Sequence, residues 1–155
     1  MEKFPDEELG ELIKRLKESW GEELLSVILF GSWTRGEAKP GSDMDLLIVR
    51  EHLPQSRLER FRLWHSVAQE ISKTFARMLS VVLLTEEEAR AARPFYLDMT
   101  EEAVILYDKE GFFLSVLDNL RKTLTKLGAK RVRDAKGHPY WILKETCAFG
   151  EAIEL

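Results

Sequence analysis

A glycine–serine pair at the end of an apolar run has the residue types that bind a phosphate group. Gly31 and Ser32 follow a run that ends at Phe30. Glycine lets the backbone approach a ligand closely, and a helix that starts beside it offers free N–H groups to an anion. The Ser32 hydroxyl can donate to a phosphate oxygen, and Arg35 can add a positive charge at the same place.

Two aspartates a short distance further on could bind a metal ion. Asp43 and Asp45 are two residues apart at the start of a predicted strand, so both side chains share one face, with Cα atoms roughly 6.6 Å apart. Two carboxylates on one face can share one divalent cation or hold two of them about 3.5–4 Å apart. Mg²⁺ completes its coordination with phosphate oxygens and water. A phosphate-binding turn beside this pair predicts metal-dependent phosphoryl chemistry on a nucleotide.

Each of these features by itself more often has a structural role than a role in ligand binding. Gly-Ser after a strand is usually only a turn, Asp-x-Asp usually ends a strand or caps it, and an arginine such as Arg35 usually lies at the surface. Their combination between two apolar runs is much rarer by chance. The three histidines show no metal-binding spacing and are predicted to lie at the surface or to be satisfied by neighbours: His52, His65 and His138. Trp33, inside the turn, could pack in the core or stack on a base.

The elements that must position these residues alternate between helices and strands. Short apolar runs predict strands over Leu24–Phe30, Asp43–Val49 and Leu79–Leu84, with a further short strand over Ala103–Tyr107. Helical spacing predicts helices over Asp6–Trp20, from Pro54 through Phe75, and from about 110 to 127. Thr85 followed by Glu88 predicts a short, capped helix that Pro94 ends.

This order predicts an α+β fold with a small mixed sheet and helices packed on it. The chain of 155 residues suits one domain, with a core over about 6–107 and a C-terminal helix and tail over about 110–155. Leu58 and Phe61 stand on an apolar helix face whose aromatic residues Phe61, Trp64 and Phe75 are predicted to lie in the core, although such a face could also leave a dimer surface.

Composition and charge exclude several classes. No apolar run approaches the roughly 20 residues of a membrane helix. The acidic start lacks a secretory pattern, and Cys147 is the only cysteine, so we expect a cytoplasmic protein with no internal disulfide. Few amides with many Glu, Lys and Arg is a thermophile signature.

The formal charge of −4 argues against a nucleic-acid coat protein. The stretch Arg121–Lys144 nevertheless carries eight basic residues against Asp134 as the one acid. We interpret it as a solvated face, with RNA binding as the alternative.

The motifs together resemble a known family. Gly31-Ser32-x-x-x-Gly36 followed by Ser42-Asp43-x-Asp45-Leu46 resembles the nucleotidyltransferase signature of the DNA polymerase β superfamily. The minimal nucleotidyltransferases of archaea and bacteria, often encoded beside a helical partner protein, are the most similar members. Three later segments resemble the tails of archaeal members: Gly128–Arg131, Tyr140-Trp141 and Phe149-Gly150-Glu151.

The resemblance implies both a reaction and a set of site residues. An acceptor hydroxyl attacks the α-phosphorus of a nucleoside triphosphate, and pyrophosphate leaves. Asp43 and Asp45 would be the catalytic residues and would hold one or two Mg²⁺ ions. The expected phosphate-binding residues are Gly31, Ser32, Arg35 and Ser42.

One position departs from the family pattern. A third carboxylate is expected on the strand Leu79–Leu84, where the matching residue is Ser80, which can supply neither charge nor a base near neutral pH. Either the register differs, or another acid serves (Glu70, Glu86 or Asp98), or transfer is weak. The alternative function is therefore a catalytically weakened nucleotide-binding or antitoxin-like, partner-binding protein.

The acceptor stays open at this stage. The chain lacks the extra domains of the family's polymerases and tRNA enzymes, so a protein hydroxyl, a small molecule or an RNA end are all compatible with it, RNA least. A helical protein partner or a second copy could complete the site.

Overall fold

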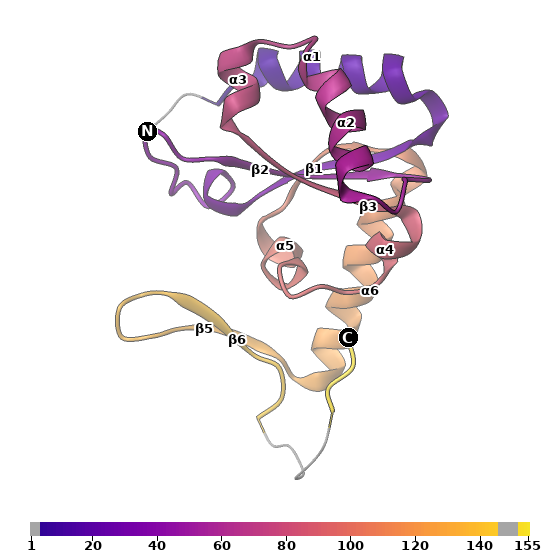
Figure 1. Cartoon of the computed structure of the whole chain (residues 1–155). Coiled ribbons are helices and arrows are strands. Elements are labelled where there is room, and N and C mark those ends of the chain that lie inside the picture. Colours follow the sequence, from indigo (N-terminus) through magenta and orange to yellow (C-terminus); the bar gives the residue numbers. More distant parts are fainter. Residues whose placement is uncertain (1–3, 146–151) are drawn as a thin grey trace.

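A four-stranded mixed sheet forms the centre of the molecule (Figure 1). The computed structural model describes residues 4–145 and 152–155. The strands are β1 (Leu24–Phe30), β2 (Met44–Arg50), β3 (Leu79–Thr85) and β4 (Val104–Asp108), in the order β3-β2-β1-β4. β1 is antiparallel to β2 and β4, whereas β2 and β3 are parallel. The α+β class and the mixed sheet predicted from the sequence are thus confirmed.

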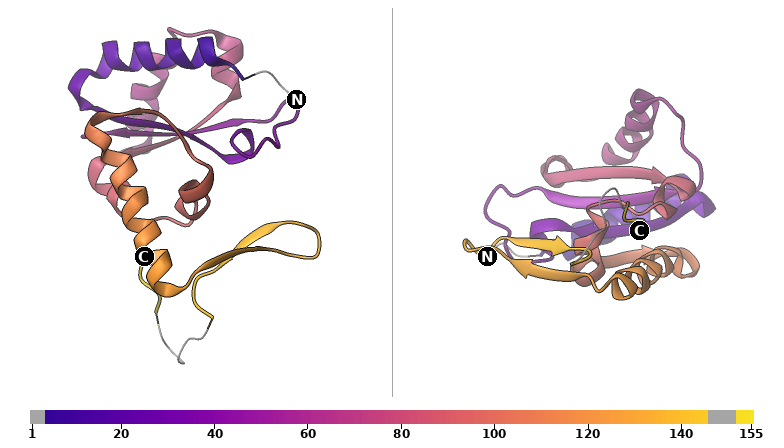
Figure 2. Two further views of the ribbon diagram at one scale, coloured as in Figure 1. Left: turned by 180° about the vertical axis from the view of Figure 1, so that it is seen from behind. Right: turned by 90° about the horizontal axis from the view of Figure 1, so that it is seen from below.

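Helices cover both faces of the sheet (Figures 1 and 2). One face carries α1 (Asp6–Trp20), α2 (Arg57–Ala68) and α3 (Lys73–Met78). The other carries α4 (Glu86–Arg90), α5 (Tyr96–Glu102) and α6 (Phe112–Leu127). Single 3-10 turns over Gly21–Glu23, Gly31–Trp33 and Lys109–Gly111 join some of these elements. No helix within the described ranges has the length and apolar character needed to cross a bilayer.

The alternation of side chains along β2 explains the two layers of helices. Met44, Leu46 and Ile48 are buried against the α1 side, whereas Leu47 and Val49 are buried against the α6 side. A central strand that is apolar on both faces needs a helix layer on each. Asp45 stands between Met44 and Leu46, so its side chain lies on the α6 side.

The prediction of one continuous helix from Pro54 through Phe75 is wrong, because the segment forms two helices. These are α2 and α3, and the Ser72 hydroxyl caps α3 by accepting a hydrogen bond from the Phe75 backbone N–H at 3.4 Å. Serine at such a position favours a new helix start over continuation. Leu58 and Phe61 are 57% and 59% exposed, so their part of the apolar face does not close the core.

The C-terminal region contains two further elements that the sequence reading did not predict. Strands β5 (Lys130–Arg133) and β6 (Pro139–Ile142) form a hairpin that stands apart from the main sheet (Figure 2). Arg131 anchors it through ion pairs with Glu102, with Glu101 at 3.2 Å and with Asp98 at 3.3 Å. The Trp141 Nε1–H donates to Asp98 at 3.0 Å. Cys147 and the segment Phe149-Gly150-Glu151 lie outside the described residues.

The region between Thr85 and β4 also differs in part from the prediction. The capping box of Thr85 and Glu88 is confirmed at the start of α4. Beyond Pro94, however, a second helix, α5, forms where none was predicted. Its Tyr96 is fully buried, and the Tyr96 hydroxyl donates to the Ala89 backbone carbonyl at 2.9 Å, which joins α5 to α4.

Removing this hydroxyl should destabilise the fold. Tyr96→Phe leaves a buried carbonyl without its partner, so we expect the free energy of unfolding to fall by about 1–2 kcal/mol. Tyr140→Phe is the matched control, because Tyr140 is 48% exposed and should give no measurable change. Urea denaturation followed by circular dichroism measures both variants, and equal midpoints would contradict the expectation.

Candidate functional site

The end of β1 and the start of β2 bring the glycine turn and an aspartate together. Phe30 pairs with Asp45 in the antiparallel ladder, which places Gly31 directly beside the Asp45 side chain. A Cβ on Gly31 would lie 2.2 Å from Asp45 Oδ2, and the Gly31 φ angle is +81°. Both the space and the backbone conformation therefore require glycine. The glycine turn and the aspartate motif, separated in the sequence, form one site.

The turn after β1 is held by its own hydrogen bonds. The Gly31 carbonyl accepts from the Thr34 backbone N–H at 3.1 Å and from the Thr34 hydroxyl at 2.8 Å, and the Ser32 carbonyl accepts from the Glu37 N–H at 3.0 Å. Trp33 is buried in the core on the α1 side, with its ring edge-on to Phe4. Of the two interpretations of Trp33, packing is the one that the structure supports.

The two aspartates differ in their surroundings. Asp43 is exposed and Asp45 is half-buried. Burial raises the pKa of the Asp45 carboxyl, and the negative charge of Asp43 raises it further. A hydrogen bond from Ser80 and the positive charge of Arg35 oppose this rise in pKa. The ionised pair is therefore electrostatically unfavourable by itself, and a bound cation would relieve it.

The other two residues expected to bind phosphate are already engaged. Arg35 Nε lies 3.0 Å from Glu37 Oε2, and Arg35 Nη1 lies 3.8 Å from Glu102 Oε2. The Ser42 hydroxyl accepts from the Lys39 backbone N–H at 2.8 Å and so closes the turn that leads into Asp43. Arg35 would have to exchange a carboxylate for a phosphate in order to bind one, whereas Ser42 positions the aspartate motif.

Ser80 stands where the family resemblance implies a third carboxylate. It pairs with Asp45 in the parallel ladder between β2 and β3, so the expected register is the register of the structure. None of the three acids considered as substitutes is shown beside Ser80 in the described part of the chain. Glu86 follows the far end of β3 and pairs with Arg90 at 2.7 Å, Asp98 pairs with Arg131, and the charge of Glu70 acts on Arg15.

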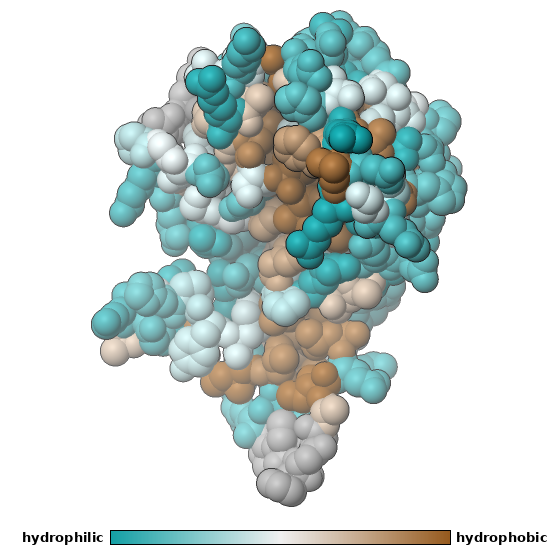
Figure 3. All heavy atoms as spheres, in the orientation of Figure 1, coloured by the Kyte–Doolittle hydropathy of each residue, from teal (hydrophilic) through white to brown (hydrophobic). Residues whose placement is uncertain are grey.

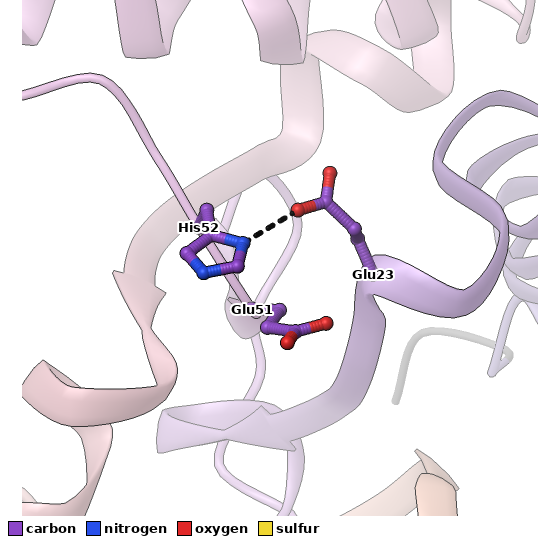
Figure 4. Close-up of side chains that lie close together, drawn as sticks. All are labelled: Glu23, Glu51 and His52. Carbon is purple, nitrogen blue, oxygen red and sulfur yellow. Dashed lines mark hydrogen bonds and ion pairs between the residues drawn. The ribbon is translucent and has the colours of Figure 1, made fainter.

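A second cluster of potential metal ligands lies at the opposite end of the β1–β2 pair (Figure 4). Ligand atoms of Glu23, Glu51 and His52 lie within 4.8 Å of one another. His52 Nδ1 is 3.0 Å from Glu23 Oε1, and Arg50 Nη2 is 2.5 Å from Glu23 Oε2. Because Arg50 already balances the Glu23 charge, the cluster is an ion-pair network. His52 is a surface residue, as predicted, but its pairing with Glu23 across the two strands was not foreseen.

The basic stretch Arg121–Lys144 is divided between α6 and the β5–β6 hairpin. Arg121 pairs with Asp118 at 2.6 Å and Lys130 with Glu145 at 2.8 Å, while Arg131 is held by the carboxylates of α5. Part of its charge is therefore balanced within the protein, which supports the interpretation as a solvated face.

The fold and this site together define a class of protein. A small mixed sheet with helices on both faces places a glycine–serine turn against an Asp-x-Asp motif at the ends of two paired strands. The sequence pattern of the nucleotidyltransferase domain family matches residues 9–124, and the chain belongs to that family. The resemblance noted from the sequence motifs is thereby confirmed.

Individual relatives refine the comparison. The chain is 27% identical over 128 residues to a protein of Methanocaldococcus jannaschii named "Putative protein adenylyltransferase MJ1305", covering 81% of this chain and 87% of that protein. A chain in the crystal structure of a toxin–antitoxin with AMP-PNP superposes with a TM-score of 0.50 and 18% identity, covering 77% of this chain and 92% of that chain. A chain from a tri-AMPylated Shewanella oneidensis HEPN toxin in complex with MNT antitoxin gives a TM-score of 0.48 and 16% identity, covering 81% and 93%.

The contact between Gly31 and Asp45 predicts a strict requirement for glycine. Gly31→Ala should lower the free energy of unfolding by about 1–3 kcal/mol, because the positive φ is strained for alanine and the new methyl group would displace the Asp45 carboxylate. Gly10→Ala is the control: Gly10 lies in α1 with open space around it, so alanine there should stabilise the protein by about 0.5–1 kcal/mol. Denaturant titration of both variants tests this, and a Gly31→Ala variant as stable as the wild type would refute the contact.

Proposed function

We propose that this protein is an adenylyltransferase that moves AMP from ATP to a hydroxyl group of an acceptor protein, with Mg²⁺. The observation that carries the proposal is the packing of Asp45 against Gly31, with Asp43 two residues away. Family membership supports nucleotidyl transfer as the reaction class. The name of the Methanocaldococcus jannaschii relative supports ATP as the donor and a protein as the acceptor.

The residues present fit a magnesium site. Asp43 and Asp45 would hold the ion, because carboxylate oxygens are the ligands that Mg²⁺ prefers. A divalent cation between them would also offset the repulsion between their two negative charges. When bound, Mg²⁺ supplies the positive charge that neutralises the triphosphate and the departing pyrophosphate.

The remaining groups would bind and orient the nucleotide. The backbone N–H groups of the turn Gly31–Trp33 and the Ser32 hydroxyl are suited to the triphosphate oxygens. Arg35 lies close enough to act on Asp45, and it would add charge to the same site if it exchanged Glu102 for a phosphate.

The reaction forms a bond between the acceptor oxygen and the α-phosphorus. The bond from the α-phosphorus to the bridging oxygen of the β-phosphate breaks, and pyrophosphate leaves with that electron pair. The proton of the acceptor hydroxyl must pass to water or to an ionised carboxylate outside β3, because Ser80 cannot accept it near neutral pH.

Ser80 also supports a second candidate function. With two carboxylates the site retains the means to bind a metal–nucleotide complex, whereas position 80 lacks the carboxylate that the family resemblance implies as the base for the acceptor. A nucleotide-binding protein that acts on its partner mainly by association, with weak transfer, is therefore the alternative.

The first test is magnesium-dependent binding of ATP. Calorimetric titration should show that Asp43→Ala weakens MgATP binding at least about tenfold, because half of the carboxylate pair is lost. Glu51→Ala is the matched control, since Glu51 is an exposed acid in the distant ion-pair network and should leave binding unchanged. Addition of the purified protein to a cell extract with ATP should increase the labelling of protein from the α-phosphate but not from the γ-phosphate, and addition of the Asp43→Ala variant should not. An ATP affinity that is the same with and without Mg²⁺, and the same in the wild type and in Asp43→Ala, would refute the site.

The role of position 80 has its own test. Ser80→Asp should raise the rate of AMP transfer at least about tenfold, because a carboxylate beside Asp45 can bind metal and accept a proton. Ser80→Asn has the same shape without the charge and should give no gain. Equal rates for all three proteins would show that Ser80 does not limit transfer, whereas MgATP binding without transfer in any of them would favour the alternative function.

A further inference from the structure

A single arginine of the β5–β6 hairpin pairs with three carboxylates of helix α5. Arg131 Nε lies 3.3 Å from Asp98 Oδ1, Arg131 Nη1 lies 3.2 Å from Glu101 Oε2, and the same nitrogen pairs with Glu102. The Arg131 side chain is only 13% exposed. Because the family pattern matches residues 9–124, this cation comes from outside the matched domain and balances acids that lie inside it. Figure 3 shows mainly hydrophilic side chains over the projecting part of the hairpin, so its attachment depends on contacts at its base.

Glu102 is shared between this arginine and the candidate site. Its Oε1 pairs with Arg131, whereas its Oε2 lies 3.8 Å from Arg35 Nη1. The Glu102 side chain is 18% exposed, and its Oε2 is buried without a hydrogen-bond partner among the described residues. A buried carboxylate oxygen in this state is unfavourable. An approach of the Arg35 guanidinium by about 1 Å would give it a charge-assisted hydrogen bond of ordinary length.

Arg35 is therefore the group that this carboxylate can capture. Its positive charge acts on Asp45, where it opposes the rise in pKa that burial causes, and its Nε lies 3.0 Å from Glu37 Oε2. Under the proposed function, Arg35 exchanges Glu102 for a phosphate of the nucleotide. The ease of this exchange depends on how strongly Glu102 holds Arg35. Arg131 weakens that hold, because it already offsets much of the Glu102 charge.

We propose that Arg131 and Glu102 are positioning residues for Arg35, with Arg131 keeping Glu102 from capturing the guanidinium that binds the nucleotide phosphates. The inference rests on the proposed function for the role of Arg35. Glu102 holds Arg35 beside the glycine turn through a long ion pair, and Arg131 keeps that pair long enough for a phosphate to replace it. The hairpin thus contributes to the site through one carboxylate of α5.

Calorimetric titration of MgATP tests this arrangement with two single variants and their combination. Arg131→Met keeps the packing of the side-chain stem but removes the charge, so Glu102 should capture Arg35 and MgATP binding should weaken at least about fivefold. Glu102→Gln releases Arg35 and should tighten binding at least about threefold. The combined variant has no carboxylate at position 102 to capture Arg35, so its affinity should return at least to the wild-type value.

A purely structural role of Arg131 gives a different pattern. If Arg131 only anchored the hairpin, the loss of affinity in Arg131→Met would persist in the combined variant, and Glu102→Gln would not tighten binding. Glu101→Gln is the matched control: it removes the same charge from the same helix and the same arginine, but Glu101 has no ion pair with Arg35 in the described part of the chain. Its MgATP affinity should equal that of the wild type. These two glutamine variants retain Arg131, so their comparison decides the question even if Arg131→Met does not fold.

Urea denaturation separates this inference from the proposed function, because it needs no nucleotide. With Arg131 present, the shifts in urea midpoint caused by Arg35→Ala and Glu102→Gln should add, since these groups interact weakly at 3.8 Å. In the Arg131→Met background the combined shift should differ from the sum, because both substitutions remove the same newly formed ion pair.

Two results would overturn the inference. The first is a set of midpoint shifts that add in both backgrounds. The second is a loss of MgATP affinity that the combined variant retains, together with equal affinities for Glu102→Gln and the wild type. ATP binding that depends on neither Mg²⁺ nor Asp43 would instead refute the proposed function, and the denaturation measurements would then decide the inference by themselves.

Discussion

The functional part of this molecule depends on one steric constraint, the contact of the Asp45 carboxylate with the backbone of Gly31. That contact exists because β1 and β2 pair so that Phe30 faces Asp45. Both strands are buried on both faces of the sheet, so they have little freedom to move apart. The helix layers thus determine where a carboxylate and the glycine turn meet, although no α-helix contributes Asp45 or Gly31.

The electrostatics of the site follow from the same arrangement. Asp45 is held half-buried with Asp43 close by, and the positive charge of Arg35 balances the pair only in part. A site with excess negative charge favours binding of a metal cation, and a nucleotide can bring that cation as a metal–nucleotide complex. The hydroxyl of Ser80 donates a hydrogen bond to Asp45 without adding negative charge, so position 80 supports the carboxylate that would bind the cation but offers no base for an acceptor.

The central elements and the meeting of the glycine turn with the aspartate motif could be predicted from the sequence because their signals are local. The runs Leu24–Phe30 and Leu79–Leu84 are apolar and rich in β-branched or leucine residues, and the parallel register that places Ser80 beside Asp45 followed from the position of each residue within its strand. The capping box at Thr85 and the stop at Gly128 were equally local.

What could not be predicted depends on tertiary contacts. The apolar period continues from Val67 to Phe75 through the break between α2 and α3, so periodicity alone did not reveal the new start at Ser72. Helix α5 is stabilised by burial of Tyr96 against α4 and α6, and the hairpin by Arg131, which reaches carboxylates about thirty residues earlier in the chain. The pair of His52 with Glu23 likewise exists only once β1 and β2 are side by side.

One shared carboxylate gives the hairpin a connection to the site. Glu102 pairs with Arg131 of β5 and also lies 3.8 Å from Arg35, which follows the glycine turn. The two cations therefore share one acid, each on a different carboxylate oxygen. By thermodynamic linkage, an anion that drew Arg35 away from Glu102 would leave that carboxylate to Arg131 and tighten the attachment of the hairpin. Reciprocally, a molecule that bound the hairpin and displaced Arg131 from Glu102 would strengthen the interaction of Glu102 with Arg35. Anion binding at Arg35 and attachment of the hairpin are therefore coupled through Glu102.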